Sequence, residues 1–279
     1  MTAFDSRRDD VPPLAQGRAL RLGAVSYLNT KPLVYGLSEA PDQFDVRFDV
    51  PSKCALLLHE GTVDLGLIPA IEYLRGDYRI VPDVSIASDG EVATVAVFTR
   101  MPIARVKTIA LDVSSKTSVA LTRVLCAKHW AIEPAFTPSE PDLDAMLARA
   151  DAALVIGDPA FDVDPDHRGV DKIDLGAEWK AMTGLPFVYA MWVGRPGAAS
   201  AAQCRALQQA RDRGVVHLRD IARDAGNGDP ELERRSLEYL RDNLKYGLGD
   251  REAAGLRRFH ELAAELGLVP ALYPLRYYD

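Results

Sequence analysis

The sequence predicts two α/β lobes with a ligand cleft between them. Strand and helix patterns alternate from residue 21 to residue 74 and again from residue 108 onward, which favours parallel sheets covered by helices. Between these parts, residues 81–98 are rich in Val, Ile and Thr and leave little room for a helix. After residue 200 the apolar spacing is helical. We therefore expect C-terminal helices to complete the first lobe, with the second lobe inserted into it.

The lobes are expected to be joined by two crossings, near residues 99 and 190. Lobe 1 is predicted to comprise residues 20–98 and 190–279, and lobe 2 residues 99–189. Residues 1–19 carry several charges and two adjacent prolines and are predicted to form a flexible N-terminal arm. Periplasmic binding proteins share this two-lobed architecture and close around a ligand by hinge motion.

The first lobe is predicted to begin with three strand and helix pairs. Pro32 is tolerated in the first turn of the first helix, and Ser52 is expected to cap the second, which Gly61 ends. The strands are expected at 21–26, 45–50 and 63–69, and the helices at 30–37, 52–60 and 71–74.

The second lobe and the C-terminal segment follow the same rules. A helix in lobe 2 is expected to be capped near Ser139, and residues 185–193 form a strand that returns the chain to lobe 1. Other strands are expected at 108–113, 134–137 and 152–156, and helices at 119–130 and 178–182. In the final helix one apolar face is formed by Leu256, Phe259, Ala263 and Leu266. We expect this face to cover a sheet.

Two polar loops follow buried strands at corresponding places in the two lobes. In "GAVSYLNTKPLVYGL" the strand runs into Ser26–Thr30, and "TIALDV" runs into "SSKTS", residues 114–118. A helix N-terminus exposes unpaired N–H groups and positive potential, so it suits an anion. Hydroxyl residues there often only cap the helix, which is the structural alternative. Two such loops facing one cleft favour a ligand with two anionic ends.

Several function classes are disfavoured by composition. The formal net charge is −7 and no Lys/Arg run stands out, which argues against nucleic-acid binding. No apolar signal segment or membrane-spanning stretch is recognisable, so we predict a cytoplasmic protein with no membrane partner. Cys54, Cys126 and Cys204 are odd in number and widely spaced, and are predicted to be buried free thiols.

Metal and cofactor motifs are also missing from the sequence. The five histidines form no HExxH motif or close pair, and no GxSxG elbow or GxGxxG pattern is present. We therefore expect chemistry without a metal or cofactor.

Three separated segments carry a family resemblance. "VSYLNTKPL", "ADAALVIGD" and "LGAEWKAMTGLPFVYAMW" together resemble the chorismate dehydratase family of the futalosine route to menaquinone, and the resemblance extends from Arg21 to the C-terminal helices. It implies a periplasmic-binding-protein-like (type II) fold and the removal of water from chorismate, a dicarboxylate, to give 3-[(1-carboxyvinyl)oxy]benzoate. The sister family, 1,4-dihydroxy-6-naphthoate synthase, opens with a motif like "SPCPNDT", which this sequence lacks.

The resemblance implies catalytic roles for Asn29 and Thr94. Asn29 would orient the substrate or stabilise charge, and Thr94, where relatives often carry serine, would contact the leaving hydroxyl. Neither is a conventional base at neutral pH. The base is then one of the substrate's own carboxylates or Asp158, which at a strand end could instead cap the following turn.

Substrate binding is assigned to the two polar loops. Ser115, Thr117, Ser118 and, less directly, Lys116 are expected to bind one carboxylate, although a first-turn lysine is often only solvated. The other end is assigned to Ser26 and the backbone near Asn29, and Gly157 is expected to allow a close backbone approach. Tyr189 either faces the cleft or packs in the core.

Two readings from other classes remain. One is a non-catalytic binding protein or sensor for a small aromatic or dicarboxylic anion, since a fold does not fix a function. The other is a regulatory ligand-binding domain, which would normally be fused to a DNA-reading helix-turn-helix. The oligomeric state and the order of C–H and C–O cleavage are left open.

Overall fold

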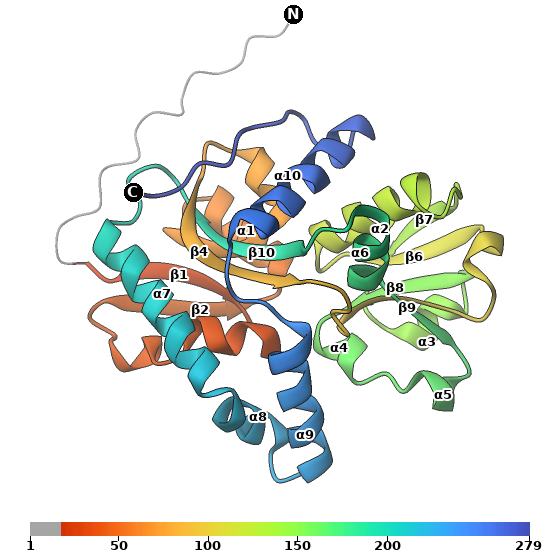
Figure 1. The fold of residues 1–279 in the computed structure, drawn as a ribbon, viewed down its shortest axis with the longest axis horizontal. Helices are drawn as coiled ribbons and strands as arrows, with labels where there is room; N and C mark the ends of the chain where they lie inside the picture. Colours follow the sequence, from red (N-terminus) through yellow and green to blue (C-terminus); the bar gives the residue numbers. More distant parts are fainter. Residues whose placement is uncertain (1–17) are drawn as a thin grey trace, which may run out of the picture.

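The chain forms two sheets that lie side by side, each with helices on its faces (Figure 1). A computed structural model describes residues 18–279. The predicted two-lobed α/β architecture is confirmed. Residues 1–17 of the predicted arm lie outside the described residues, whereas Arg18 at its end donates hydrogen bonds of 3.0 Å to both carboxylate oxygens of Asp64.

The sheet of lobe 1 has the strand order β2-β1-β3-β10-β4. Strands β1, β2 and β3 are parallel, and β10 runs antiparallel between β3 and β4. All eight residues of β10 are buried, as expected for a strand with neighbours on both sides. The strand bounds are β1 Leu20–Val25, β2 Phe44–Asp49, β3 Leu65–Pro69, β4 Arg79–Ser88 and β10 Phe187–Gly194.

The sheet of lobe 2 has the order β7-β6-β8-β5-β9. Strand β6 pairs in parallel with β7 and β8, and β5 is antiparallel to β8 and β9. The strand bounds are β5 Val95–Thr99, β6 Thr108–Asp112, β7 Ala135–Ser139, β8 Ala152–Ile156 and β9 Asp171–Asp174.

Sheet pairing puts the crossings at residues 89–94 and 184–186, earlier than the predicted positions near 99 and 190. Strand β5, placed in lobe 1 on sequence, belongs to the sheet of lobe 2, and β10 joins lobe 1 from Phe187. Both β4 and β5 contain several Val, Ile or Ala residues, and such a pattern indicates a strand without indicating its neighbours. Below, lobe 1 means residues 18–88 and 187–279, and lobe 2 means residues 95–183.

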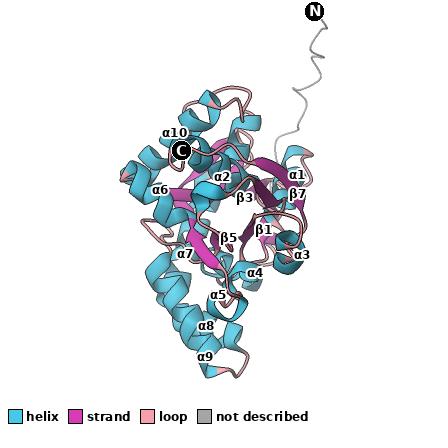
Figure 2. Cartoon of the chain, turned by 90° about the vertical axis from the view of Figure 1, so that its right-hand side faces the viewer, coloured by secondary structure: helices cyan, strands magenta, loops and turns pink. Residues whose placement is uncertain are grey.

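Helices of lobe 1 come from both ends of the chain. Pro32 lies inside a 3-10 helix rather than at the start of an α-helix, and the second predicted helix begins at Pro51 and has no side-chain cap from Ser52. Figure 2 shows α8 and α9 projecting from one end of the molecule. The bounds are 3-10 helices Leu28–Val34, Leu37–Glu39 and Ala70–Arg75, α1 Pro51–His59, α7 Ala201–Val216, α8 Leu218–Gly226, α9 Pro230–Glu238, a π-helix at Tyr239–Asn243, and α10 Asp250–Glu265.

Helices of lobe 2 are mostly short. Asp142, rather than Ser139, caps the helix after β7, because Ser139 is still part of that strand. The bounds are a 3-10 helix at Ile103–Arg105, α2 Lys116–Lys128, α3 Leu143–Leu147, α4 Asp158–Phe161, α5 Pro165–Arg168 and α6 Leu175–Thr183.

An aromatic cluster packs α6 of lobe 2 against β10 and α10 of lobe 1. The Phe187 ring lies 5.1 Å from Trp179 and 4.9 Å from Phe259 between centroids, both in edge-to-face geometry. The predicted apolar face of the final helix is confirmed, since Leu256, Phe259 and Ala263 are buried. The three cysteines are buried and free, as predicted. In the described part of the chain, no helix has both the length and the apolarity to cross a membrane.

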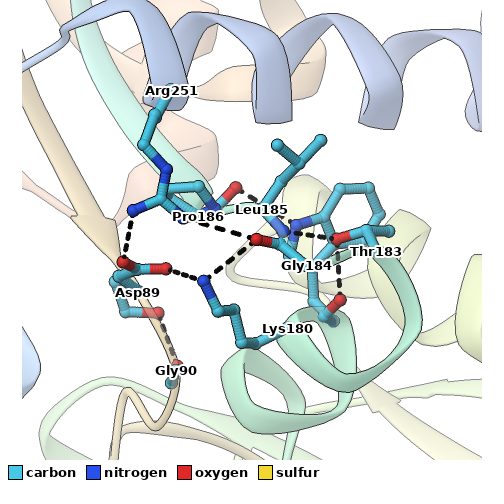
Figure 3. A network of polar contacts seen from close by, with 10 residues as sticks. Asp89, Gly90, Lys180, Thr183, Gly184, Leu185, Pro186 and Arg251 are labelled. Atoms are coloured by element: carbon cyan, nitrogen blue, oxygen red, sulfur yellow. Dashed lines mark hydrogen bonds and ion pairs between the residues drawn. The ribbon is translucent and has the colours of Figure 1, made fainter.

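A polar network ties the two crossings together (Figure 3). The carboxylate of Asp89, in the first crossing, accepts hydrogen bonds from Lys180 of α6 and Arg251 of α10. Lys180 also donates to the carbonyl of Gly184, in the second crossing, at 3.0 Å. These three side chains therefore connect both crossings and both lobes at one point.

Candidate functional site

A small cavity lies between the two sheets, near the C-terminal ends of β1, β3 and β8. Its volume is about 40 Å³, which gives room for roughly three water molecules. Both lobes and the first crossing contribute to its wall, and the polar or glycine residues in that wall are Tyr27, Asn29, Thr94, Ser115, Ser118, Gly157 and Tyr189. A binding site at this edge of the sheets is typical of open α/β folds.

Asn29 and Thr94 meet at a tyrosine that the sequence analysis missed. The Thr94 hydroxyl lies 2.8 Å from the Tyr239 hydroxyl, and the Asn29 side chain is near enough to Tyr239 to act on its pKa. Burial raises the pKa of Tyr239, so its hydroxyl remains neutral. Tyr239 opens a π-helix, an irregularity that is frequent at functional sites. Its sequence context resembles an ordinary amphipathic helix, so the sequence carried no signal for it.

The side chains of residues 114–118 point in two directions, some toward the cavity and some toward lobe 1. The Ser115 hydroxyl caps α2 by accepting from Ser118 N–H at 3.4 Å, and the Ser118 hydroxyl lies 3.2 Å from it. Both serines line the cavity, so Ser115 caps the helix and faces the cavity at the same time. The Thr117 hydroxyl instead accepts from the N–H of Ile71 in lobe 1, at 3.1 Å.

Lys116 also faces lobe 1 rather than the cavity. Its ammonium lies 3.4 Å from a carboxylate oxygen of Glu72, a fully buried residue that also contacts His59 at 2.8 Å and Arg75 at 2.8 Å. Burial alone would raise the pKa of Glu72, but the His59 hydrogen bond and the charges of Lys116 and Arg75 outweigh it and lower the pKa. Lys116 therefore joins the lobes through a buried carboxylate.

Asp158 and Gly157 also bring the lobes together. A carboxylate oxygen of Asp158 accepts from the N–H of Leu28 in lobe 1 at 3.1 Å, and burial raises the Asp158 pKa. Gly157 has φ +66° and ψ −151°, and a Cβ there would lie 2.6 Å from the Tyr27 ring. Its predicted role in a close approach thus takes the form of a contact with the other lobe.

The remaining predicted residues lie in different surroundings. Ser26 is exposed and lies outside the cavity wall, and its N–H continues the pairing of β1 with β2 by donating to Asp49 at 3.0 Å. Tyr189 lines the cavity while its hydroxyl lies 3.0 Å from Ser88, so it both faces the cleft and packs.

Further contacts across the cleft show that the two lobes are closed on each other. The Ser52 N–H donates to the Ser114 carbonyl at 2.9 Å. Arg235 of α9 also reaches lobe 2, where it donates to the Phe161 carbonyl at 2.7 Å and stacks over the Phe161 ring at 4.8 Å. Among residues 18–279, no group of three or more His, Cys, Asp or Glu side chains is placed to hold a metal ion.

Comparisons with known proteins show which sequences the chain resembles. A family model described as menaquinone biosynthesis matches residues 20–265. The chain is 31% identical over 271 residues to the chorismate dehydratase of Thermus thermophilus, covering 91% of this chain and 98% of that relative. It is 29% identical over 177 residues to the chorismate dehydratase of Campylobacter jejuni, covering 60% of this chain and 64% of that relative.

Solved structures share the fold at low sequence identity. Protein AF1704 of Archaeoglobus fulgidus matches with a TM-score of 0.69 at 17% identity, over 91% of this chain and all of that one (100%). The alkanesulfonate-binding protein SsuA of Xanthomonas axonopodis pv. citri, bound to MOPS, matches with a TM-score of 0.65 at 16% identity, over 92% and 96% of the two chains. The predicted periplasmic-binding-protein-like fold is thereby confirmed.

Proposed function

Since the chain belongs to the menaquinone biosynthesis family, we propose that it is a chorismate dehydratase, a hydro-lyase that converts chorismate to 3-[(1-carboxyvinyl)oxy]benzoate. The observation that carries this proposal is the 31% identity to a curated chorismate dehydratase over almost the whole of both chains. The cavity supports it, because polar loops from two lobes face the same space, which suits a small dicarboxylate.

The two loops are proposed to bind the two carboxylates of chorismate. Ser115 and Ser118 lie at the N-terminus of α2, a helix of 13 residues, where hydroxyls and backbone N–H groups attract an anion. The Asn29 amide offers donors from the opposite lobe. Lys116 and Thr117 are proposed to act on closure instead of on the substrate, because both contact lobe 1. Ser26 has no proposed contact with substrate.

Chemistry is assigned to Asn29 and Thr94. The reaction breaks the C–H bond at the ring carbon that bears the enolpyruvyl ether and the C–O bond of the ring hydroxyl. The hydroxyl leaves as water, and the ring becomes aromatic. Thr94 would hydrogen-bond the departing hydroxyl, and Asn29 would stabilise the charge that develops as the proton leaves. Tyr239 hydrogen-bonds Thr94 and lies near Asn29, and it is proposed as the positioning residue for both side chains.

The base is proposed to be one of the substrate's own carboxylates. Asp158 is the protein alternative, but one of its oxygens accepts a hydrogen bond from Leu28, and its side chain is outside the cavity wall. A substrate carboxylate held by Ser115 and Ser118 needs no protein base, and the site offers acceptor and donor groups but no histidine.

Substrate entry requires the lobes to separate. The closed cavity has room for only a few water molecules, which is far less than chorismate occupies. Hinge opening at residues 89–94 and 184–186 would admit the substrate, and closure would exclude water from the reaction. Turnover without a metal or cofactor and a cytoplasmic location stay predictions.

The test is to incubate the purified, EDTA-treated protein with chorismate and follow the products by liquid chromatography and mass spectrometry. Formation of the enolpyruvyl benzoate with loss of one water would support the proposal. Tight binding of chorismate without turnover would favour a sensor, and absence of binding would contradict the assignment. Asn29→Ala should lower kcat by about 100-fold. Asn243→Ala is the matched control, because the half-buried Asn243 is outside the cavity wall and its side chain donates to the Glu91 carbonyl.

A further inference from the structure

The first crossing contains a residue in an unfavourable backbone conformation next to Thr94. Ala93 has φ +65°, the left-handed region that residues with a Cβ rarely adopt. Such a conformation persists only where its surroundings impose it, and it is common at functional sites. The question is what holds Ala93 in place.

Two side chains of β9, Lys172 and Asp174, bind the backbone of Val92 and Ala93. The carboxylate of Asp174 accepts from Val92 N–H at 3.1 and 3.2 Å and from Ala93 N–H at 2.7 Å. Lys172 donates to the Ala93 carbonyl at 2.6 Å. Both polar groups of the Ala93 backbone are therefore bound by side chains of lobe 2.

The next residue is Thr94, whose position depends on this segment. The Thr94 carbonyl accepts from Gly157 N–H at 2.8 Å, and its hydroxyl lies against Tyr239 at 2.8 Å. Because Asp174 fixes the residue before Thr94, it also fixes the direction in which the Thr94 hydroxyl enters the cavity. Asp174 is not itself among the residues that line the cavity.

Helix capping alone does not account for Asp174. Asp174 caps α6 by accepting from Ala177 N–H at 3.0 Å, much as Asp142 caps α3 by accepting from Ala145. Unlike Asp142, it also accepts three hydrogen bonds from Val92 and Ala93. Each of its oxygens accepts at least two bonds, so neither is left to act as a base toward the substrate.

We propose that Asp174 is a positioning residue whose carboxylate imposes the left-handed conformation of Ala93 and thereby places the Thr94 hydroxyl against the substrate. This inference rests on the proposed function, since it takes Thr94 to contact the leaving hydroxyl. The chemical requirement is for two acceptor oxygens at position 174: one caps α6, and the other binds the Ala93 N–H.

Asp174→Asn is the direct test, because it keeps one acceptor oxygen and replaces the other by a donor. We expect kcat to fall by about 10- to 100-fold, the range expected for losing one imposed backbone conformation, while KM changes less than about threefold. Ala93→Gly in the Asp174→Asn background should restore most of kcat, because glycine adopts φ +65° without strain. Asp142→Asn is the matched control and should leave kcat unchanged.

Rescue separates positioning from a general loss of structure. If Asp174→Asn keeps the parental kcat, or if Ala93→Gly fails to restore it, the inference is overturned while the dehydratase assignment stands. If Asp174→Asn does not fold, Lys172→Met removes the other support without touching the α6 cap, and it should show a smaller loss that Ala93→Gly also restores. No loss in Lys172→Met would then overturn the inference.

Failure of the wild type to act on chorismate would refute the proposed function but not this inference. Hydrogen exchange then tests the inference without an activity measurement. The Val92 and Ala93 amides should exchange at least about tenfold faster in Asp174→Asn than in the wild type or in Asp142→Asn. Equal exchange in all three proteins would overturn the inference.

Discussion

Gly157 provides a sharp test of whether lobe closure is needed for function. In Gly157→Ala the new methyl group would lie 2.6 to 2.8 Å from three atoms of the Tyr27 ring, which belongs to the other lobe. The backbone at φ +66° and ψ −151° is also in a region almost restricted to glycine. The substitution therefore has one cost within lobe 2 and a second cost that arises only when the lobes close.

The two costs can be separated by a second glycine. The backbone strain at Gly157 is of the order of 1–3 kcal/mol in either state. Gly169 has φ +60° and ψ +45°, and a Cβ there meets nothing within 4 Å. Gly169→Ala should thus cost about 1–2 kcal/mol of strain alone. We expect both variants to lower the Tm by a few degrees, at roughly 2–4 °C per kcal/mol.

Activity should distinguish the two glycine variants. Gly157→Ala should reduce kcat/KM for chorismate by at least about 100-fold, because a contact below 3 Å opposes closure by several kcal/mol. Gly169→Ala should stay within about twofold of the parental kcat/KM. A fluorescence energy-transfer pair with one dye on each lobe reports closure independently. Equal kcat/KM in the two variants, or unchanged closure in Gly157→Ala, would refute the reasoning.

Three further predictions concern single side chains. Thr94→Ser should retain turnover and Thr94→Val should lose about 100-fold in kcat, because only serine keeps a hydroxyl for the leaving group. Equal kcat values in the two variants would show that the Thr94 hydroxyl takes no part in the reaction. Lys116→Met should raise KM several-fold, because it removes the ion pair with Glu72 that joins the lobes. The free energy of unfolding should change by less than about 1 kcal/mol, since the lysine is 46% exposed. An unchanged KM would show that this ion pair does not contribute to lobe closure. Burial lowers the pKa of His260 to about 4. Between pH 6.5 and 4 the unfolded chain therefore binds a proton at His260 that the folded chain does not bind. The free energy of unfolding should fall by up to about 3 kcal/mol as the pH drops through that window. Acid unfolding of His260→Gln should be less steep there, and an identical pH profile would contradict the assignment.

The positions of the polar loops could be predicted from sequence because they follow buried strands. Which side chain of a loop faces the cavity depends on finer geometry. Ser115 and Ser118 are three residues apart and lie on one side of the α2 terminus, whereas Lys116 and Thr117 turn toward lobe 1. Helical spacing alone predicts that Ser115 and Ser118 share one side of the helix terminus. It does not predict which side faces the cavity, because that depends on how α2 packs in the fold.

Other features depend on contacts between distant parts of the chain. Tyr239 reaches Thr94 across a separation of 145 residues, and no local pattern marks it as different from a core tyrosine. The assignment of β5 to lobe 2 depends on its pairing with β8 and β9, which come later in the chain. Local periodicity therefore predicts elements well and their partners poorly.

The position of β10 has a consequence for the order in which the lobes fold. Among residues 18–279, strand β4 pairs with β10 and makes isolated bridges to Lys245 and Tyr277. The sheet of lobe 1 therefore cannot be completed before β10, which ends at Gly194, and the two bridges need segments still later in the chain. The strands of lobe 2 lie within residues 95–174 and need no later segment to pair. We expect lobe 2 to gain amide protection first during refolding, with β4 last, and pulse-labelled hydrogen exchange would measure this order. Simultaneous protection of β4 and β8 would contradict it.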